Sequence, residues 1–413
     1  MRYASITDRL SGLGGDKWAV HLAGRERAAS GEDLIFLSIG EPDLPPPAAV
    51  VETAVASLRA GRTRYTVGQG DPRALEAIAN HYTRRSGSTV HPSQIVFTAG
   101  TQNALSAVMS ALVEAGDEVL VPDPYYATYE GVVAATGATF VPVPTLPADG
   151  FHLRPSALNA LVTERSRVLL LNTPANPTGA VLSADEIDAI GEVCRRNDLW
   201  IVCDEVYADI TFNAAFASPF DRPHLRDRSV SVASISKSHA LPGFRSGWAA
   251  GPVELATRLT SVVESMLFGS QPFLADAVVT ALSVRHVEVD RLAAEFQRRA
   301  EALFTALSSC PAVGARMPEG GMFALLDIRS TGLSGEEFAW RLLTEKKVVV
   351  MPGESFGAGG AGHIRVALTV EGDVIEEACR RIADLAMSLQ EARSANTDLS
   401  AGNGVGHGEF VHK

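Results

Sequence analysis

The sequence has few cysteines and no long apolar run. Its four cysteines, Cys194, Cys203, Cys310 and Cys379, form no CxxC pair. Neither a disulfide framework nor a structural metal site is therefore indicated. No stretch of about 18 apolar residues occurs, and the first residues lack the apolar core of a signal peptide. These absences predict a cytoplasmic protein that does not span a membrane.

Positive charge is also scarce, because 36 Lys and Arg stand against 48 Asp and Glu, for a net charge of -12. A protein that binds the nucleic-acid backbone needs clustered Lys and Arg, so nucleic acid is not an expected partner. The ten histidines are scattered without ligand spacing, which predicts no metal site. What is present is a 46% hydrophobic chain of 413 residues. That balance is typical of a globular protein with one large and one smaller domain.

Apolar segments alternate with helical periods along the body of the chain. The strand-like runs are 95–98, 118–121, 167–171, 199–203 and 230–234. This alternation predicts a mostly parallel sheet between helices. One helix start is well marked, because Ser183 and Glu186 have the spacing of a capping box.

The chain divides into four predicted parts. Residues 1–47 are expected to form an N-terminal arm that packs with the small domain and ends in a strand at 34–39 and a proline-rich connector. A large domain at 48–290 follows, and one long helical segment at 272–307 leads to a small domain at 291–395. Residues 396–413 have too few apolar side chains to bury, so they are expected to be a disordered tail.

One lysine stands in an informative setting. Lys237 lies among small polar residues directly after the run 230–233. The tetrapeptide 234–237 alone is weak evidence for a catalytic lysine, because a lysine after a strand is usually a surface residue. The order of the other polar and aromatic residues is stronger evidence for a catalytic lysine. That order is the turn 98–102, Tyr126, Asn176, Asp204 with Tyr207 three residues on, Lys237, Arg245 eight residues later, and Arg365. From about residue 38 to 382, the chain resembles the class I/II aminotransferases.

The resemblance implies an α/β protein, a fold-type I pyridoxal-phosphate enzyme. Its large α/β/α domain would have a mostly parallel sheet, beside a smaller α+β domain. In that family, the residue matching Lys237 holds pyridoxal 5'-phosphate covalently and moves the substrate's proton. Asp204 would keep the pyridine nitrogen protonated, and an ionised carboxylate after an apolar strand does need a cation. Tyr207 and Asn176 match residues that bond the cofactor's phenolic oxygen.

The turn 98–102 is a natural phosphate site, because Ala99, Gly100 and Thr101 offer backbone amides and a hydroxyl at a helix start. The resemblance adds Ser234, Ser236 and Arg245 as further phosphate contacts. It matches Tyr126 to the residue that stacks on the pyridine ring, with Tyr125 as the alternative. Tyr65 matches a tyrosine that reaches the phosphate of the neighbouring subunit, which implies a homodimer with shared active sites.

The resemblance assigns substrate contacts to Gly40, Asn176 and Arg365. Arg365 would grip the α-carboxylate, a bidentate task suited to a guanidinium. His239 is expected to lie outside the reaction. No second arginine for a side-chain carboxylate can be identified, so a dicarboxylate substrate is not favoured.

Four segments (236–240, 266–270, 320–323 and 329–334) most closely resemble the arginine:pyruvate aminotransferases. An arginine substrate needs a carboxylate at its guanidinium, and Glu41 and Asp43 are the nearest acids to a substrate-matching position. An aspartate, aromatic or general aminotransferase is the alternative. A pyridoxal-phosphate lyase would use the same residues. A non-enzymatic sensor would need a DNA-binding segment before the body, for which the arm leaves no room.

Overall fold

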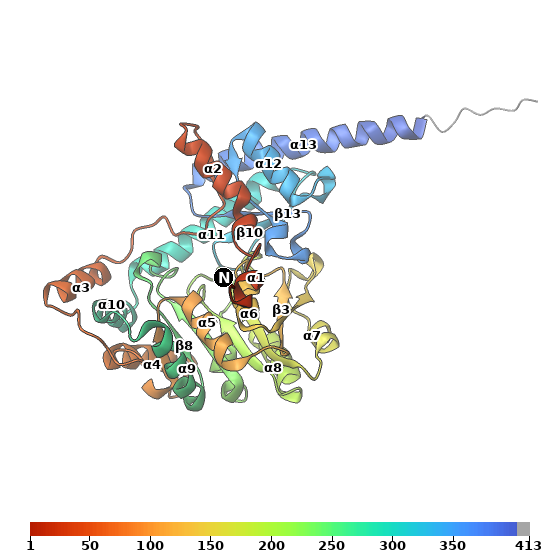
Figure 1. The fold of residues 1–413 in the computed structure, drawn as a ribbon. Coiled ribbons are helices and arrows are strands. Elements are labelled where there is room, and N and C mark those ends of the chain that lie inside the picture. The colour runs from red at the N-terminus through yellow and green to blue at the C-terminus, as the bar shows by residue number, and fades with distance from the viewer. Residues whose placement is uncertain (403–413) are drawn as a thin grey trace, which may run out of the picture.

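The computed structural model describes the backbone of residues 1–402 and the side chains of residues 1–394. The last helix, α13 (Gly372–Gly402), extends away from the body of the molecule (Figure 1). The prediction of a disordered tail is therefore wrong for residues 396–402, which are helical. Once a helix is nucleated, each further residue adds a hydrogen bond at little cost, and this offsets the polar composition. The rest of the predicted tail lies outside the described residues.

A seven-stranded sheet forms the centre of the larger part of the molecule. In spatial order its strands are β2 (Ile95–Thr98), β8 (Gly247–Ala250), β7 (Ser229–Ser234), β6 (Trp200–Asp204), β5 (Ser166–Asn172), β3 (Glu118–Asp123) and β4 (Thr139–Pro144). Only β8 runs antiparallel to its neighbours. The mostly parallel sheet predicted from the alternating pattern is confirmed. Its parallel strands all bring their carboxyl ends to one edge, where such sheets bind ligands.

Helices cover both faces of this sheet (Figure 1). Alternate strand residues such as Val168 and Leu170 pack with α5 (Thr101–Leu112), α6 (Tyr129–Thr136) and α9 (Val253–Leu267). The residues between them face the other layer. That layer contains α3 (Ala48–Arg59), α4 (Pro72–Ser86), α7 (Pro155–Leu161), α8 (Ala184–Arg196) and α10 (Pro272–Ser283). Burial on both faces explains why these strands read as continuous apolar runs.

The second part is built on a four-stranded antiparallel sheet of order β12-β13-β10-β9. Its strands are β9 (Gly314–Ala315), β10 (Phe323–Asp327), β12 (Met351–Pro352) and β13 (His363–Ala367), and its helices include α11 (Val287–Leu307), α12 (Gly335–Lys346) and α13. The single helical segment predicted at 272–307 is two helices, because Val284 and His286 take extended backbone conformations between α10 and α11. The boundary predicted at 290/291 falls inside α11.

The N-terminal arm contacts both parts. Helix α2 (Ala19–Ala29) and strand β1 (Ile35–Phe36) pack on the smaller part, where β1 pairs in parallel with β11 (Val348–Val349). Helix α1 (Ser5–Arg9) lies instead against α6 of the larger part. The arm therefore packs with the small domain only through its second half, and the strand predicted at 34–39 is shorter. Within the described part of the chain, no helix is long and apolar enough to cross a membrane.

Candidate active site

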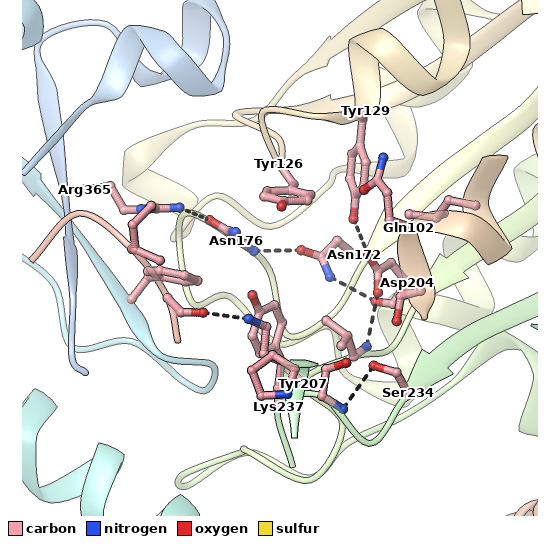
Figure 2. A pocket seen from close by; sticks show the side chains of 18 of the residues that line it. Gln102, Tyr126, Tyr129, Asn172, Asn176, Asp204, Tyr207, Ser234, Lys237 and Arg365 are labelled. Atoms are coloured by element: carbon pink, nitrogen blue, oxygen red, sulfur yellow. Dashed lines mark hydrogen bonds between the residues drawn. The ribbon is translucent and has the colours of Figure 1, made fainter. Parts of the chain in front are cut away.

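A cavity of about 340 Å³ lies at the carboxyl edge of the large sheet, where the arm and the smaller part meet it. Its walls contain most of the residues predicted from the sequence, namely Gly40, Thr101, Tyr126, Asn176, Asp204, Tyr207, Ser234, Ser236, Lys237, Arg245 and Arg365. Residues separated by more than 300 positions thus surround one space. Figure 2 shows many of these side chains directed into it.

Lys237 lies in the turn that follows β7. Its ammonium donates a hydrogen bond of 2.6 Å to the Gly40 carbonyl oxygen, as Figure 2 shows. Burial lowers the pKa of Lys237 to about 8, and the carboxylate of Glu41 partly opposes that shift. A lysine with this pKa has a substantial neutral fraction near neutral pH, which a nucleophile or a base requires.

Asp204 is the last residue of β6 and is fully enclosed. Its carboxylate accepts hydrogen bonds from the Tyr129 hydroxyl at 2.8 Å and the Val206 amide at 3.2 Å. Burial raises the pKa of Asp204 to about 6. No cation forms an ion pair with it among the described residues, so the buried carboxylate can still accept a positively charged group from the cavity.

A cradle of backbone and hydroxyl groups lies beside Asp204. Gly100 has a φ of +85° and precedes Thr101, the first residue of α5. A Cβ at Gly100 would come within 2.4 Å of Arg245 Nη2, so only glycine allows the guanidinium this close. Arg245 Nη2 donates to the Ala99 carbonyl at 3.3 Å. The buried Thr101 hydroxyl oxygen has no hydrogen-bond partner among the described residues.

Arg365 projects from β13 into the opposite wall. Its guanidinium lies between the rings of Phe323 and Phe356, with its carbon 4.1 and 4.5 Å from the two ring centroids. It donates to Asn176 Oδ1 at 3.0 Å and to the Ser38 carbonyl. Burial lowers the pKa of Arg365 to about 10, so it stays charged at neutral pH. Its Nε atom has no partner among the described residues, which leaves this buried cation ready for a carboxylate.

Two aromatic residues complete the cavity. Tyr207 and Tyr126 both direct their rings into it (Figure 2). Burial raises the pKa of both hydroxyls, and the nearby Asp204 charge adds to the increase. Both tyrosines are therefore neutral donors at physiological pH. The alternative, Tyr125, points elsewhere, because its hydroxyl donates to Glu130.

Several functional candidates were missed in the sequence. Tyr129 bonds Asp204 directly, and Asn172 links Asp204 to Asn176 through its Nδ2 and Oδ1 atoms, at 2.9 and 2.7 Å. Trp18 and Phe323 also line the cavity. Asn172 could have been found, since it directly follows a predicted strand, as Asp204 does.

Besides Tyr125, the residues named from the sequence that do not line the cavity are Ala99, Gly100, Glu41, Asp43, Tyr65 and, as expected, His239. Asp43 forms a bidentate ion pair with Arg299, both distances being 2.8 Å, so it is not available to a substrate. Tyr65 is 85% exposed and contacts Phe268 at the surface. His239 is buried against Ser238 and the Ala281 carbonyl. The four cysteines are free.

Residues 32–382 match the family model "Aminotransferase class I and II". The chain belongs to this family. The enzyme is 41% identical to the arginine–pyruvate transaminase AruH of Pseudomonas aeruginosa, over 94% of this chain and 99% of that protein. It is 30% identical to an aspartate aminotransferase of Geobacillus stearothermophilus, over 87% and 92% of the two chains.

The aminotransferase also resembles solved structures of fold-type I enzymes. One is the aspartate aminotransferase of Thermus thermophilus with maleate, with a TM-score of 0.88, 30% identity, and coverage of 93% of this chain and 100% of that chain. The predicted fold class and the aminotransferase class are thereby confirmed.

Proposed function

We propose that this enzyme uses pyridoxal 5'-phosphate in the cavity around Lys237 to move the α-amino group of an amino acid to a 2-oxo acid. The observation that supports this most is the placement of three groups in one cavity: a half-buried lysine, a buried carboxylate without a cation, and a buried arginine without a carboxylate. A protonated pyridine would supply the cation for the carboxylate. The α-carboxylate of an amino acid would supply the anion for the arginine, and the lysine would act on the groups held between them.

The residues fit the cofactor. The phosphate would bind at Gly100, Thr101, Ser234, Ser236 and Arg245, where the unpartnered Thr101 hydroxyl and the Arg245 guanidinium converge. Asp204 would hold a proton on the pyridine nitrogen, with Tyr129 fixing the carboxylate. Asn176 and Tyr207 would bond the phenolic oxygen, and Tyr126 would cover the ring. Bound there, the cofactor supplies an electron sink for the pair released at the α-carbon.

The remaining work is done by protein side chains. Arg365 would hold the α-carboxylate and so orient the Cα–H bond toward Lys237. Lys237 Nζ would take the α-proton from the amino donor and, in the reverse half-reaction, return a proton to the α-carbon derived from the 2-oxo acid. Its lowered pKa allows both transfers. The Gly40 carbonyl, 2.6 Å from Nζ, would keep the amine directed into the cavity.

Replacing Arg365 with lysine should raise KM for all amino donors and 2-oxo acids by roughly tenfold, with kcat less affected. The reason is that a point charge would replace a planar fork at the shared carboxylate. Steady-state kinetics with an aliphatic, a basic and an aromatic donor measure it. A loss confined to one donor class would make Arg365 a side-chain specificity residue instead.

We infer further that the preferred donor is arginine and the acceptor pyruvate. The similarity to AruH supports this, together with the position of Glu41. Asp43 is occupied by Arg299, whereas the Glu41 carboxylate acts electrostatically on Lys237 and forms no hydrogen bond within the described residues. Of the two acids predicted to meet a substrate guanidinium, Glu41 is therefore the one without an ion pair among the described residues, and it follows the cavity-lining residue Gly40. The face of Trp18 adds a surface on which a guanidinium can stack.

Comparing kcat/KM for arginine, lysine, alanine, aspartate and phenylalanine, with pyruvate as acceptor, tests the donor. Arginine should exceed aspartate by far more than roughly tenfold, because a site made for a cation rejects an anion. If aspartate or phenylalanine equals arginine, the enzyme is a general aminotransferase, and the assignment of the cofactor site is unaffected.

A homodimer is part of the same proposal. Tyr65 and Phe268 are exposed and in ring contact at the C-terminal end of α9, and the exposed Val67 lies two residues from Tyr65. Monomers rarely leave such side chains together in water, and a second copy would cover them. Tyr65 would then reach the partner's phosphate site. The cytoplasmic location expected from the sequence remains a prediction.

A further inference from the structure

His152 bridges the two parts of the molecule outside the cavity. Its Nδ1 atom lies 2.7 Å from Glu186 Oε1, at the start of α8 in the larger part. Its Nε2 atom lies 2.9 Å from Glu319 Oε2, in the segment that leads into β10 of the smaller part. The adjoining Phe151 packs edge-on against His363 of β13, with ring centroids 5.9 Å apart. One short loop thus contacts β13 and the segment that leads into β10.

Both ring nitrogens of His152 face carboxylates, and only the protonated ring can donate to both at once. The hydrogen bond with Glu319 raises the pKa of His152 to about 9; burial opposes this shift, and Glu186 adds to it. The other charged groups nearby are Arg316, 3.9 Å from Glu319, and the pair Asp149 and Arg154. At neutral pH the bridge is therefore a cation between two anions.

Glu319 in turn fastens its own segment to the larger part. Its carboxylate accepts from the Val181 amide at 2.8 Å, and its amide donates to the Gly179 carbonyl at 2.9 Å. Its carbonyl accepts from the Phe212 amide, also at 2.9 Å. Gly320 adds a second bond to Gly179, at 3.0 Å. The loop 176–181 and the segment 319–321 are thereby held as one unit.

Each end of this unit carries a group that orients Arg365. The loop 176–181 begins with Asn176, whose Oδ1 accepts from Arg365. The segment 319–321 continues into Phe323, whose ring supports the guanidinium from one side. A shift between the loop and the segment would move Asn176 and Phe323 relative to each other. The contacts of Glu319 therefore connect His152 with both groups that contact Arg365.

We propose that protonated His152 is a positioning residue for substrate carboxylates. It anchors Glu319 and so fixes the positions of Asn176 and Phe323 relative to each other, and both of these contact Arg365. The proposal rests on the carboxylate-binding role proposed for Arg365. His152 itself touches neither the cavity nor the reacting atoms.

His152→Gln should raise KM for pyruvate about fivefold to tenfold with a smaller change in kcat, because a neutral amide can no longer bridge two carboxylates. His224→Gln is the matched control, since His224 also faces a carboxylate on α8, at 3.3 Å from Asp188, but lies exposed and far along the chain from Glu319. The control should keep the wild-type KM.

The pH dependence of KM provides a second test, which begins with the wild-type enzyme. In the wild type, KM for pyruvate should rise as the pH passes about 9, where His152 loses its proton. Pyruvate does not titrate in this range. Lys237 and Arg365 lose their protons near pH 8 and pH 10, so both also affect KM in this range. The part of the rise that is due to His152 should be absent in His152→Gln, whose remaining rise should follow Arg365 near pH 10. Glu319→Gln should raise KM in a way that is not additive with His152→Gln.

The outcomes separate the two claims. If Arg365→Lys raises KM but His152→Gln only lowers Tm, His152 is a structural bridge and this inference is wrong. A wild-type KM that stays level through pH 9 to 10 contradicts it as well. If Arg365→Lys leaves KM unchanged, the proposed carboxylate site itself fails.

Discussion

Lys237→Ala should lose transamination by roughly 10³-fold or more while keeping its fold, because Nζ is the only amine that the described residues place in the cavity, where it can both hold the cofactor and move the α-proton. The side chain makes one hydrogen bond, to Gly40, so its removal leaves the packing of the strands intact. Single-turnover transfer from arginine to pyruvate measures the loss, with circular dichroism reporting the fold.

Lys347→Ala is the matched control for this variant. Lys347 is partly exposed and pairs with Glu32, away from the cavity. It should retain wild-type turnover. If Lys237→Ala still transfers the amino group at a rate near that of the control, another base performs the proton transfer and the proposed role of Lys237 is wrong.

Asp204→Asn should lower kcat by roughly 10² to 10³-fold while the phosphate contacts keep the cofactor bound. The amide can still accept from Tyr129, but it cannot stabilise a positive charge in the buried site. Asp188→Asn, which removes a surface carboxylate paired with Arg222, is the control. Unchanged kcat in Asp204→Asn, with cofactor bound, would contradict the proposed pairing with the pyridine nitrogen.

The same variant should stabilise the cofactor-free protein. The folded pKa of about 6 lies above the ordinary value of 3.8, so the folded state binds this proton more tightly than the unfolded chain. Its stability therefore falls as the pH rises from about 4 to 6, by at most roughly 3 kcal/mol. Asp204→Asn should therefore raise the free energy of unfolding at pH 7, where the buried carboxylate is ionised, and change it little at pH 4, where the carboxylate is protonated. Urea unfolding at the two pH values measures the difference.

The sequence predicted the large sheet well because the sheet depends on local patterns. Continuous apolar runs mark strands buried on both faces, and polar residues such as Asp204 stand at their carboxyl ends. Parallel strands must bring those ends together, so Asp204 and Lys237 share one edge. The family resemblance added Arg365, which no local pattern connects with that edge.

What the sequence could not predict depends on contacts between distant segments. Asp43 was a candidate for contact with a substrate guanidinium, but its ion pair with Arg299 joins the arm to α11. The bond from Tyr129 to Asp204 requires the bend between β3 and α6, which periodicity does not describe. The arm was assigned to one domain because nothing in its composition marks the contact of Arg9 with the Ala134 carbonyl.

The claim that Lys237 binds pyridoxal 5'-phosphate covalently is tested most directly by reducing the purified enzyme with borohydride and mapping the modified peptide. Reduction fixes the cofactor on its lysine, and trypsin then fails to cut there. We predict a pyridoxyl-phosphate label on the peptide of residues 229–245, which contains Lys237 as its only lysine. A label on any other lysine, or no label on an active enzyme, would contradict the account.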